Sequence, residues 1–197
     1  KELLNLYQGV ERLSKICMKS NIVIPVGKDS LSMSTKWGNN QSCEVKSPLS
    51  LVLSAFASIE DVNNYVTPYT NRNSQLFLID LGRGKDRMGG SALDQTESYI
   101  NHESPNINKL DDLLNYFKLS QELIRKKLLN AYHDRSDGGL ITTLIEIGFA
   151  SNMSVDLKNI VKKSKTELIK FLFNEELGGV FVVDKKNEKE FSKLVRK

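Results

Sequence analysis

Cysteine, proline and tryptophan are scarce in this chain of 197 residues, which contains two cysteines, four prolines and one tryptophan. Cys17 and Cys43 have neither the CxxC spacing of metal and redox sites nor the setting of a nucleophile. So few cysteines provide no disulfide framework. We therefore expect both to be reduced thiols in a cytoplasmic protein.

Long apolar runs and a strong charge imbalance are also missing. No stretch of 18 apolar residues occurs, so we expect no transmembrane span, and the N-terminus lacks a signal-peptide pattern. The net charge is only +4, from 28 basic and 24 acidic residues. The basic residues are scattered rather than gathered, which argues against a nucleic-acid partner. Hydrophobic residues make up 40%, enough for a folded core.

The first part of the chain predicts one helix followed by strands. The sequence starts without Met inside the amphipathic pattern "KELLNLYQGVERL", which indicates a segment of a longer polypeptide. Apolar residues near the 3.6-residue period predict a helix over 2–20. A short apolar run predicts a strand over 22–26, and alternating serines and apolar residues predict strands over 30–37 and 49–59.

The second part predicts an alternation of strands and helices. Residues 61–75 are rich in turn formers and indicate a domain boundary. The near-continuous apolar run at 76–81 predicts a central strand. Further helices are expected over 90–100, 110–129, 138–150, 165–173 and 187–197, with strands at 131–133, 154–157 and 178–184. This mixed order predicts the α+β fold class.

The stretch "HDRSDGGL", residues 133–140, concentrates ionisable and small residues before a helical pattern. One interpretation is a helix cap, in which Ser136 or Asp137 accepts a hydrogen bond at the start of the helix. That interpretation leaves Asp134 unexplained. A carboxylate at a strand end beside a helix N-terminus also suits a hard cation with a phosphate, because Mg²⁺ prefers oxygen ligands and the helix dipole favours anions.

Two other stretches leave open alternatives. In "FNEELGGVFVV", Glu175 and Glu176 either lie at a helix end exposed to water or place one carboxylate in the site. The loop "LGRGKDRMGGS", residues 81–91, lacks the glycine that a dinucleotide-binding fingerprint needs at position 87. It is either an ordinary glycine turn or a loop whose backbone N–H groups approach a phosphate.

Taken in order, "IPVGKDSLSM", "SPLSLVLSAFASIEDV", "LFLIDLG", "YHDRSDGGL" and "FNEELGG" resemble the phosphoribosylformylglycinamidine synthase family in its long single-chain form. That family belongs to the superfamily of aminoimidazole-ribonucleotide-synthetase-like, ATP-dependent proteins. The resemblance implies that residues 1–70 are the end of a second N-type module, whose strands form a β-barrel. It also implies that residues 71–197 are most of a second C-type α/β layered module.

The resemblance implies a ligase function in purine biosynthesis: ATP-dependent amidation of formylglycinamide ribonucleotide with ammonia drawn from glutamine. A glutamine amidotransferase (glutaminase) domain elsewhere in the polypeptide would supply the ammonia, and this segment would contain no catalytic residue. By position, Asp134 matches the family's Mg²⁺ ligand and Ser136 matches a residue that contacts the nucleotide, ATP or ADP. The implied partners are the remaining modules of the same polypeptide and the nucleotide.

Two alternatives remain. The chain could come from another ATP-dependent member of the superfamily, such as a thiamine-phosphate or selenophosphate enzyme, although "GKDSLSM" fits those poorly. It could also be a non-catalytic assembly module. Because barrel strands would have unpaired edges in an isolated piece, we expect such a fragment to be inactive and to self-associate.

Overall fold

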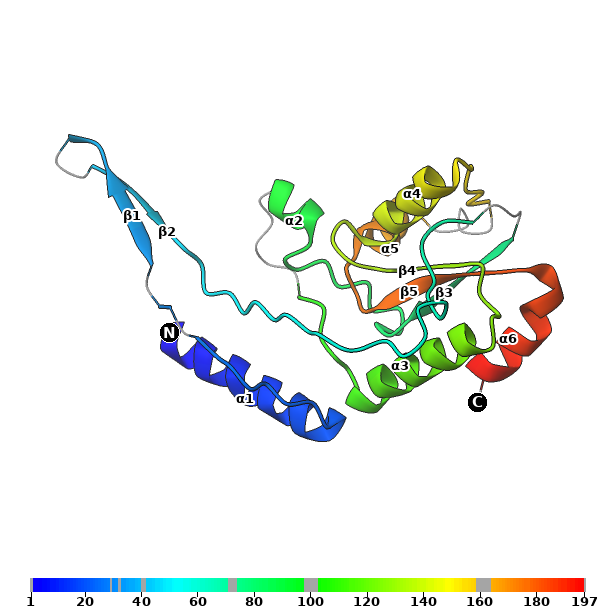
Figure 1. The fold of residues 1–197 in the computed structure, drawn as a ribbon. Helices are drawn as coiled ribbons and strands as arrows, with labels where there is room; N and C mark the ends of the chain where they lie inside the picture. Colours follow the sequence, from blue (N-terminus) through cyan, green and yellow to red (C-terminus); the bar gives the residue numbers. More distant parts are fainter. Residues whose placement is uncertain are drawn as a thin grey trace. The chain divides into compact units, whose positions relative to one another are not determined.

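The structure is a computed structural model, and it describes residues 2–28, 30–31, 33–39, 42–70, 74–97, 103–158 and 164–196. The chain divides into two compact units, Lys1–Ile59 and Glu60–Lys197. Each unit is described by itself, with the element labels of Figure 1. In the part of the chain that is described, no helix is long and apolar enough to cross a membrane.

The first unit opens with α1, Glu2–Ser20, which confirms the helix predicted over 2–20. Its half-buried positions follow the helical period and form one stripe: Leu6, Gly9, Leu13, Ile16 and Cys17. This stripe meets the extended segment 49–59, because a Cβ on Gly9 would lie 3.1 Å from Leu51 Cδ1. The helix therefore packs through a small residue at its middle.

The only strands described in this unit are β1, Ser34–Trp37, and β2, Cys43–Lys46, which pair antiparallel. The strand predicted over 30–37 is confirmed only for its second half, and position 32 lies outside the described residues. The strands predicted at 22–26 and 49–59 are wrong: both segments are coil. A strand needs a neighbour for its backbone hydrogen bonds, and no described strand of the unit pairs with either segment. Side chains such as Val52 and Phe56 stay exposed.

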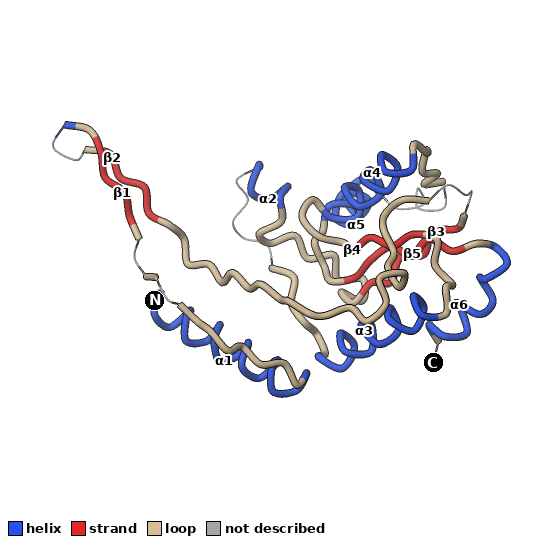
Figure 2. The backbone as a smooth tube through the Cα atoms, in the orientation of Figure 1, coloured by secondary structure: helices blue, strands red, loops and turns tan. Residues whose placement is uncertain are grey.

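The second unit is built on a three-stranded antiparallel sheet in the order β3-β5-β4 (Figures 1 and 2). The strands are β3, Gln75–Asp80; β4, Ala131–Asp134; and β5, Gly178–Val183. The strand predicted at 76–81 is confirmed, but its predicted central position is wrong. The centre is β5, whose residues from Val180 to Val183 are at most 1% exposed. A strand buried on both faces needs apolar residues without alternation.

Helices cover both faces of this sheet. Phe181 and Val183 pack on one face with α3 and α6, while Val180 and Val182 pack on the other with α4. Helix α5 contacts α4 on that second face. The bounds of the helices are α2, Ala92–Thr96; α3, Leu110–Arg125; α4, Gly139–Ser151; α5, Lys165–Phe173; the short 3-10 helix η2, Lys185–Asn187; and α6, Glu188–Val195. The result is a three-layer α/β/α arrangement.

These elements confirm the mixed α and β fold class and the predicted helices, with differences at their ends. Helix α2 is shorter than the prediction over 90–100, of which 98–100 lie outside the described residues. Helix α3 ends at Arg125 rather than at 129, because Lys127 adopts a positive φ of 53°. The strand predicted at 154–157 is wrong, since this segment has no ladder partner among the described strands.

Candidate functional site

The antiparallel register brings three separate segments to one edge of the sheet. Asp80 at the end of β3 stands opposite Gly178, and Asp134 at the end of β4 stands opposite Gly179. Because β5 begins at Gly178, the residues just before it lie at the same edge. The acidic residues of "LFLIDLG", "YHDRSDGGL" and "FNEELGG" are therefore gathered by topology. We take this sheet edge as the candidate functional site.

An ion pair between a buried guanidinium and a half-buried carboxylate joins two of these segments. The Arg135 side chain is fully buried, and its Nη2 donates to Asp80 Oδ1 at 2.6 Å. The guanidinium also donates to the backbone oxygens of Glu176, at 2.5 Å from Nε, and of Leu177, at 3.1 Å from Nη2. Its Nη1 finds no acceptor among the described residues. Arg135, directly after β4, therefore connects the end of β3 with the residues just before β5 through hydrogen bonds.

Asp80 also closes the glycine-rich loop that follows β3. Its carboxylate accepts hydrogen bonds from the backbone N–H of Gly82, at 3.0 Å, and of Gly84, at 2.8 Å. Burial by itself raises the pKa of Asp80, but hydrogen bonds from Arg135, Gly84 and Gly82, with the Arg135 charge, outweigh it. The pKa of Asp80 therefore lies below its ordinary value.

A carboxylate with a lowered pKa stabilises the fold only while it is ionised. Its contribution is present above the unfolded pKa of about 3.9 and is lost as the pH falls through the lower folded pKa. We expect the stability difference between the wild type and Asp80→Asn to shrink as the pH falls below about 4. Urea unfolding midpoints at a series of pH values measure this difference. A difference that stays constant with pH would contradict the assignment.

A second buried ion pair fixes the glycine-rich loop from the other side. Glu176 is 1% exposed and Arg87 is 6% exposed. Arg87 donates to Glu176 Oε1 from Nε at 2.5 Å and to Oε2 from Nη2 at 2.7 Å, and its backbone N–H donates to Oε1 at 3.2 Å. The hydrogen bonds that Arg87 donates to the Glu176 carboxylate raise the pKa of Arg87 further. For Glu176, the interpretation as a helix end exposed to water is wrong.

Asp134 and Ser136, the two predicted site residues, lie together where β4 ends and the loop to α4 begins. The Ser136 hydroxyl donates to Asp134 Oδ2, and the Asp134 side chain is 60% exposed. His133 holds the base of this loop, because its Nε2 lies 2.8 Å from Glu146 Oε2 and its Nδ1 lies 2.8 Å from the backbone oxygen of Asp134. The Asp134 carboxylate thus faces solvent on a loop whose backbone is held.

The start of α4 is capped differently from the prediction. Gly138 is the N-cap residue, and no side chain from its own segment caps the helix, so the predicted capping by Ser136 or Asp137 is wrong. Ser136 instead accepts the Gly139 N–H with its backbone oxygen, because its hydroxyl turns to Asp134. The Gly138 N–H donates to Glu175 Oε1 at 2.8 Å. A carboxylate from another segment therefore occupies the helix start.

Two half-buried tyrosines lie beside Gly179 on the face of the sheet that packs with α3. The hydroxyls of Tyr116, from α3, and Tyr132, from β4, lie 2.9 Å apart. Burial raises the pKa of both phenols. Both therefore stay neutral near pH 7, and their rings pack around Phe181 in the core.

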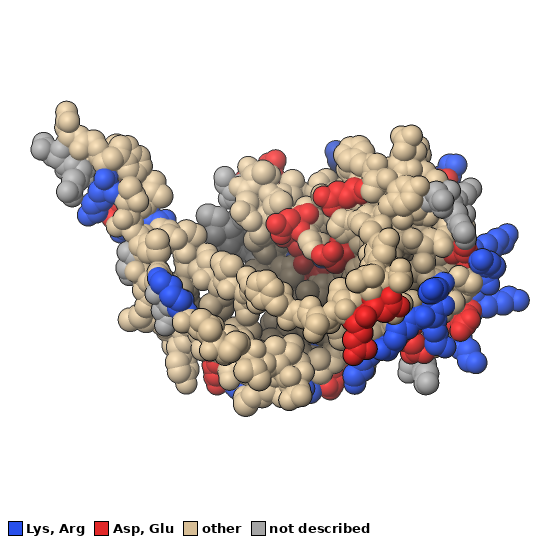
Figure 3. Space-filling model, viewed as in Figure 1, with Lys and Arg blue, Asp and Glu red and all other residues tan. Residues whose placement is uncertain are grey.

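The solvent-facing charge of the site is negative. The charges of the Arg87–Glu176 and Arg135–Asp80 pairs cancel. Among the described salt bridges, no Lys or Arg pairs with Asp134, Asp137 or Glu175. Figure 3 shows acidic side chains gathered between α2 and α4, whereas basic side chains gather toward α6. A surface of this charge favours cations, and it accepts a phosphate only when a cation accompanies it.

The donor set at this edge fits Mg²⁺ held mainly by phosphate. Within the ranges that the structure describes, no group of three His, Cys, Asp or Glu side chains is arranged to hold a metal. Mg²⁺ typically uses one or two carboxylates with phosphate oxygens and water, rather than a cage made of protein. The exposed Asp134 carboxylate could supply one such ligand, and the N-cap residue of α4, Gly138, lies four residues further along the chain.

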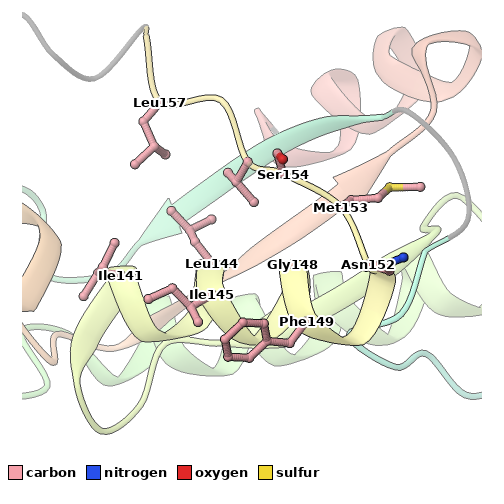
Figure 4. Close-up of a pocket in the computed structure, with 10 residues that line it drawn as sticks. Ile141, Leu144, Ile145, Gly148, Phe149, Asn152, Met153, Ser154 and Leu157 are labelled. Carbon is pink, nitrogen blue, oxygen red and sulfur yellow. The ribbon is translucent and has the colours of Figure 1, made fainter.

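An apolar groove lies apart from these charges. It has a volume of about 520 Å³ and lies between α4 and residues 152–157, as Figure 4 shows. Ile141, Ile145, Phe149 and Met153 line it, together with Leu144, Gly148, Asn152, Ser154, Val155 and Leu157. It offers no ionisable side chain, so the chemistry of an anion or metal site belongs to the sheet edge instead.

Sequence reasoning missed three residues of the site: Asp80, Arg87 and Arg135. Asp80 ended an apolar run and could have been noticed, because it directly precedes the glycine-rich loop. In the sequence, Arg87 was notable only because it occupies the position where a dinucleotide-binding fingerprint needs glycine. In the structure it is the ion-pair partner of Glu176. Arg135 was quoted in the motif, but nothing in the sequence indicated that its side chain turns inward.

Two family models match the chain in sequence order. Residues 1–58 match the FGAR-AT PurM_N-like domain, and residues 78–197 match the AIR synthase related protein, C-terminal domain. Among solved structures, the chain is similar to "T. maritima PurL complexed with ATP", with 13% identity and a TM-score of 0.46 over 78% of this chain. It is also similar to "Structure of PurLQS from Thermotoga maritima", with 11% identity and a TM-score of 0.42 over 68% of this chain. Each alignment covers 22% of the other chain.

Proposed function

Because the chain belongs to the AIR synthase related family, we propose that it is part of the synthetase core of a phosphoribosylformylglycinamidine synthase. The match of residues 1–58 to an FGAR-AT domain supports this choice within the family. Under this proposal residues 1–70 end an N-type module and residues 71–197 form a C-type module. The complete enzyme would be an ATP-dependent ligase that converts formylglycinamide ribonucleotide to the amidine, with ammonia from a separate glutaminase domain.

The role proposed for this segment is to hold a magnesium–nucleotide complex, and one observation carries it. Asp134 presents a solvent-facing carboxylate on a loop that is held from beneath by buried side chains and that leads directly into α4. The Mg²⁺ ion, when bound, would offset the charge of the phosphates. Asp134 would hold the ion, and Ser136 would contact the nucleotide.

The same features explain why the segment would bind without catalysing. Ser136 is paired with the Asp134 carboxylate, but that carboxylate is the proposed metal ligand and is then not free to act as a base. The buried Glu176 and the half-buried Asp80 are engaged with Arg87 and Arg135. A bound nucleotide would therefore act on stability, since a ligand that binds only the folded form shifts the unfolding equilibrium.

Replacing Asp134 by asparagine tests this proposal. We expect the complete protein to lose Mg²⁺-dependent nucleotide binding by about 10-fold or more, because one charged metal ligand becomes a neutral amide. Folding should be unaffected, since the carboxylate is exposed. The measurements are the nucleotide content of the purified protein and the Kd for ATP in the presence of Mg²⁺.

The matched control is Glu190→Gln, which removes an exposed carboxylate from α6. It should retain the nucleotide content and affinity of the wild type. Equal nucleotide content in the wild type and in Asp134→Asn would count against a metal-binding role for Asp134. A wild-type protein that binds neither ATP nor ADP with Mg²⁺ would reject the proposed function as a whole.

A further inference from the structure

The side chain of Glu175 connects two segments that lie far apart in the sequence. Its Oε1 accepts the backbone N–H of Ala92 at 2.8 Å and the backbone N–H of Gly138 at 2.8 Å. The backbone that carries it is fixed by the next residue, because Glu176 is held by Arg87 in the core. Glu175 is therefore an anchored carboxylate that reaches across to the start of α4.

The position of this carboxylate determines which anions can approach. The N–H of Gly138 is the first donor at the start of α4, and a bound phosphate would use donors of this kind. Glu175 already satisfies that donor with a negative charge. The Asp134 carboxylate stands on the same loop, four residues before Gly138. A free polyphosphate at the start of α4 would meet the negative charge of Glu175, and like charges repel each other.

We propose that Glu175 determines the specificity of this site by excluding nucleotides that carry no divalent ion. The inference rests on the proposed function, and it concerns the form of nucleotide that is accepted. A magnesium–nucleotide complex brings positive charge to the carboxylates and is admitted. A metal-free nucleotide is rejected by the charge of Glu175, even though the N–H groups of α4 would otherwise attract it. Asp134 and Glu175 then have different tasks, metal binding and exclusion.

The substitution Glu175→Gln separates charge from geometry. A glutamine keeps an acceptor oxygen for Ala92 and Gly138 but removes the charge. The Kd of ATP is measured by calorimetry for the complete, nucleotide-stripped protein, once with Mg²⁺ and once with EDTA. The Kd with EDTA divided by the Kd with Mg²⁺ is then compared between the wild type and each variant. We expect Glu175→Gln to reduce this ratio about 10-fold or more, mainly because metal-free ATP binds more tightly. Glu175→Ala should change the ratio in the same direction.

Two further variants make the result specific. Asp134→Asn should weaken binding of the magnesium complex and leave Glu175 in place. It therefore also reduces the ratio, but by raising the Kd with Mg²⁺ rather than by lowering the Kd with EDTA. Glu122→Gln removes an exposed carboxylate on α3, across the sheet, and should leave both Kd values unchanged. Partial unfolding of a variant lowers the binding stoichiometry and does not alter the ratio.

The outcomes distinguish this inference from the proposed function. If the wild type binds ATP with Mg²⁺ and Glu175→Gln shows the same ratio, the role of Glu175 is rejected and the proposed function stands. If Glu175→Gln weakens both forms equally, the residue is only a structural connection and the inference is again overturned. If the wild type binds no nucleotide under either condition, both proposals fail together.

Discussion

Replacing Glu176 by glutamine is expected to lower the free energy of unfolding by about 3–5 kcal/mol, the largest effect of any single charge removal at this site. The side chain is 1% exposed and accepts three hydrogen bonds from Arg87. Without the carboxylate, a guanidinium that is 6% exposed loses its main counter-charge. The remaining acidic neighbour, Glu103, lies 3.7 Å from Nη1 and is 74% exposed, so it compensates poorly.

The measurement is chemical denaturation monitored on the second unit, with Glu122→Gln as the matched control. Glu122 forms an exposed pair with Lys126 on α3, so the same substitution there should change stability by at most about 0.5 kcal/mol. The double variant Arg87→Met with Glu176→Gln should be less unstable than the sum of the single variants, because the unpaired charge disappears with Arg87. Equal effects of Glu176→Gln and Glu122→Gln would show that the buried pair does not stabilise this fold.

This ion pair also shows where sequence reasoning reached its limit. Glu175 and Glu176 are adjacent, identical in type, and look equivalent in the pattern "FNEELGG". In the structure one side chain is buried against Arg87 and the other reaches the backbone of Ala92 and Gly138. Their partners lie at least 37 positions away along the chain. No local period contains that information, so the sequence could offer only alternatives.

Elements that follow from local physics were predictable. The period of α1 and the apolar residues of α3 and α4 depend on nearest neighbours along the helix, and these helices formed where the pattern placed them. The strand predicted over 49–59 was wrong because a strand forms only when a neighbouring strand accepts its backbone hydrogen bonds. In the first unit only β1 and β2 are paired among the described residues, and the pattern could not show which strands would lack neighbours.

The candidate site was predictable in part for the same reason. Asp134 and Ser136 are two positions apart at the end of β4, and their proximity follows from the sequence alone. The sequence does not show why the loop after β4 is held in place. The Arg135 side chain turns inward and donates to Asp80 on another strand, and no local pattern indicates this contact. Gly82 is a further example. A Cβ there would lie 2.7 Å from the Glu176 carboxyl carbon, which explains a glycine that the sequence presented only as part of a turn.

Substitution of Gly139 by alanine is expected to destabilise the second unit by about 3 kcal/mol or more. Gly139 is the first residue of α4 and has a φ of 74°, a conformation that costs other residues about 1–2 kcal/mol. The added Cβ would also lie 2.7 Å from the backbone oxygen of Asn174 and 2.7 Å from the carbonyl carbon of Phe173. Both neighbours are backbone atoms, so they cannot move aside by a change of rotamer.

The control Gly84→Ala separates the two contributions. Gly84 has a φ of 71°, close to that of Gly139, but no atom lies within 4 Å of a Cβ built there. It should therefore show only the conformational cost, about 1–2 kcal/mol, in the same denaturation experiment. Its backbone N–H to Asp80 is kept in the variant. Equal losses for the two variants would mean that the start of α4 shifts freely away from the end of α5. In that case the Gly138 N–H would not be held against Glu175, and the geometry on which the proposed role of Glu175 depends would be wrong.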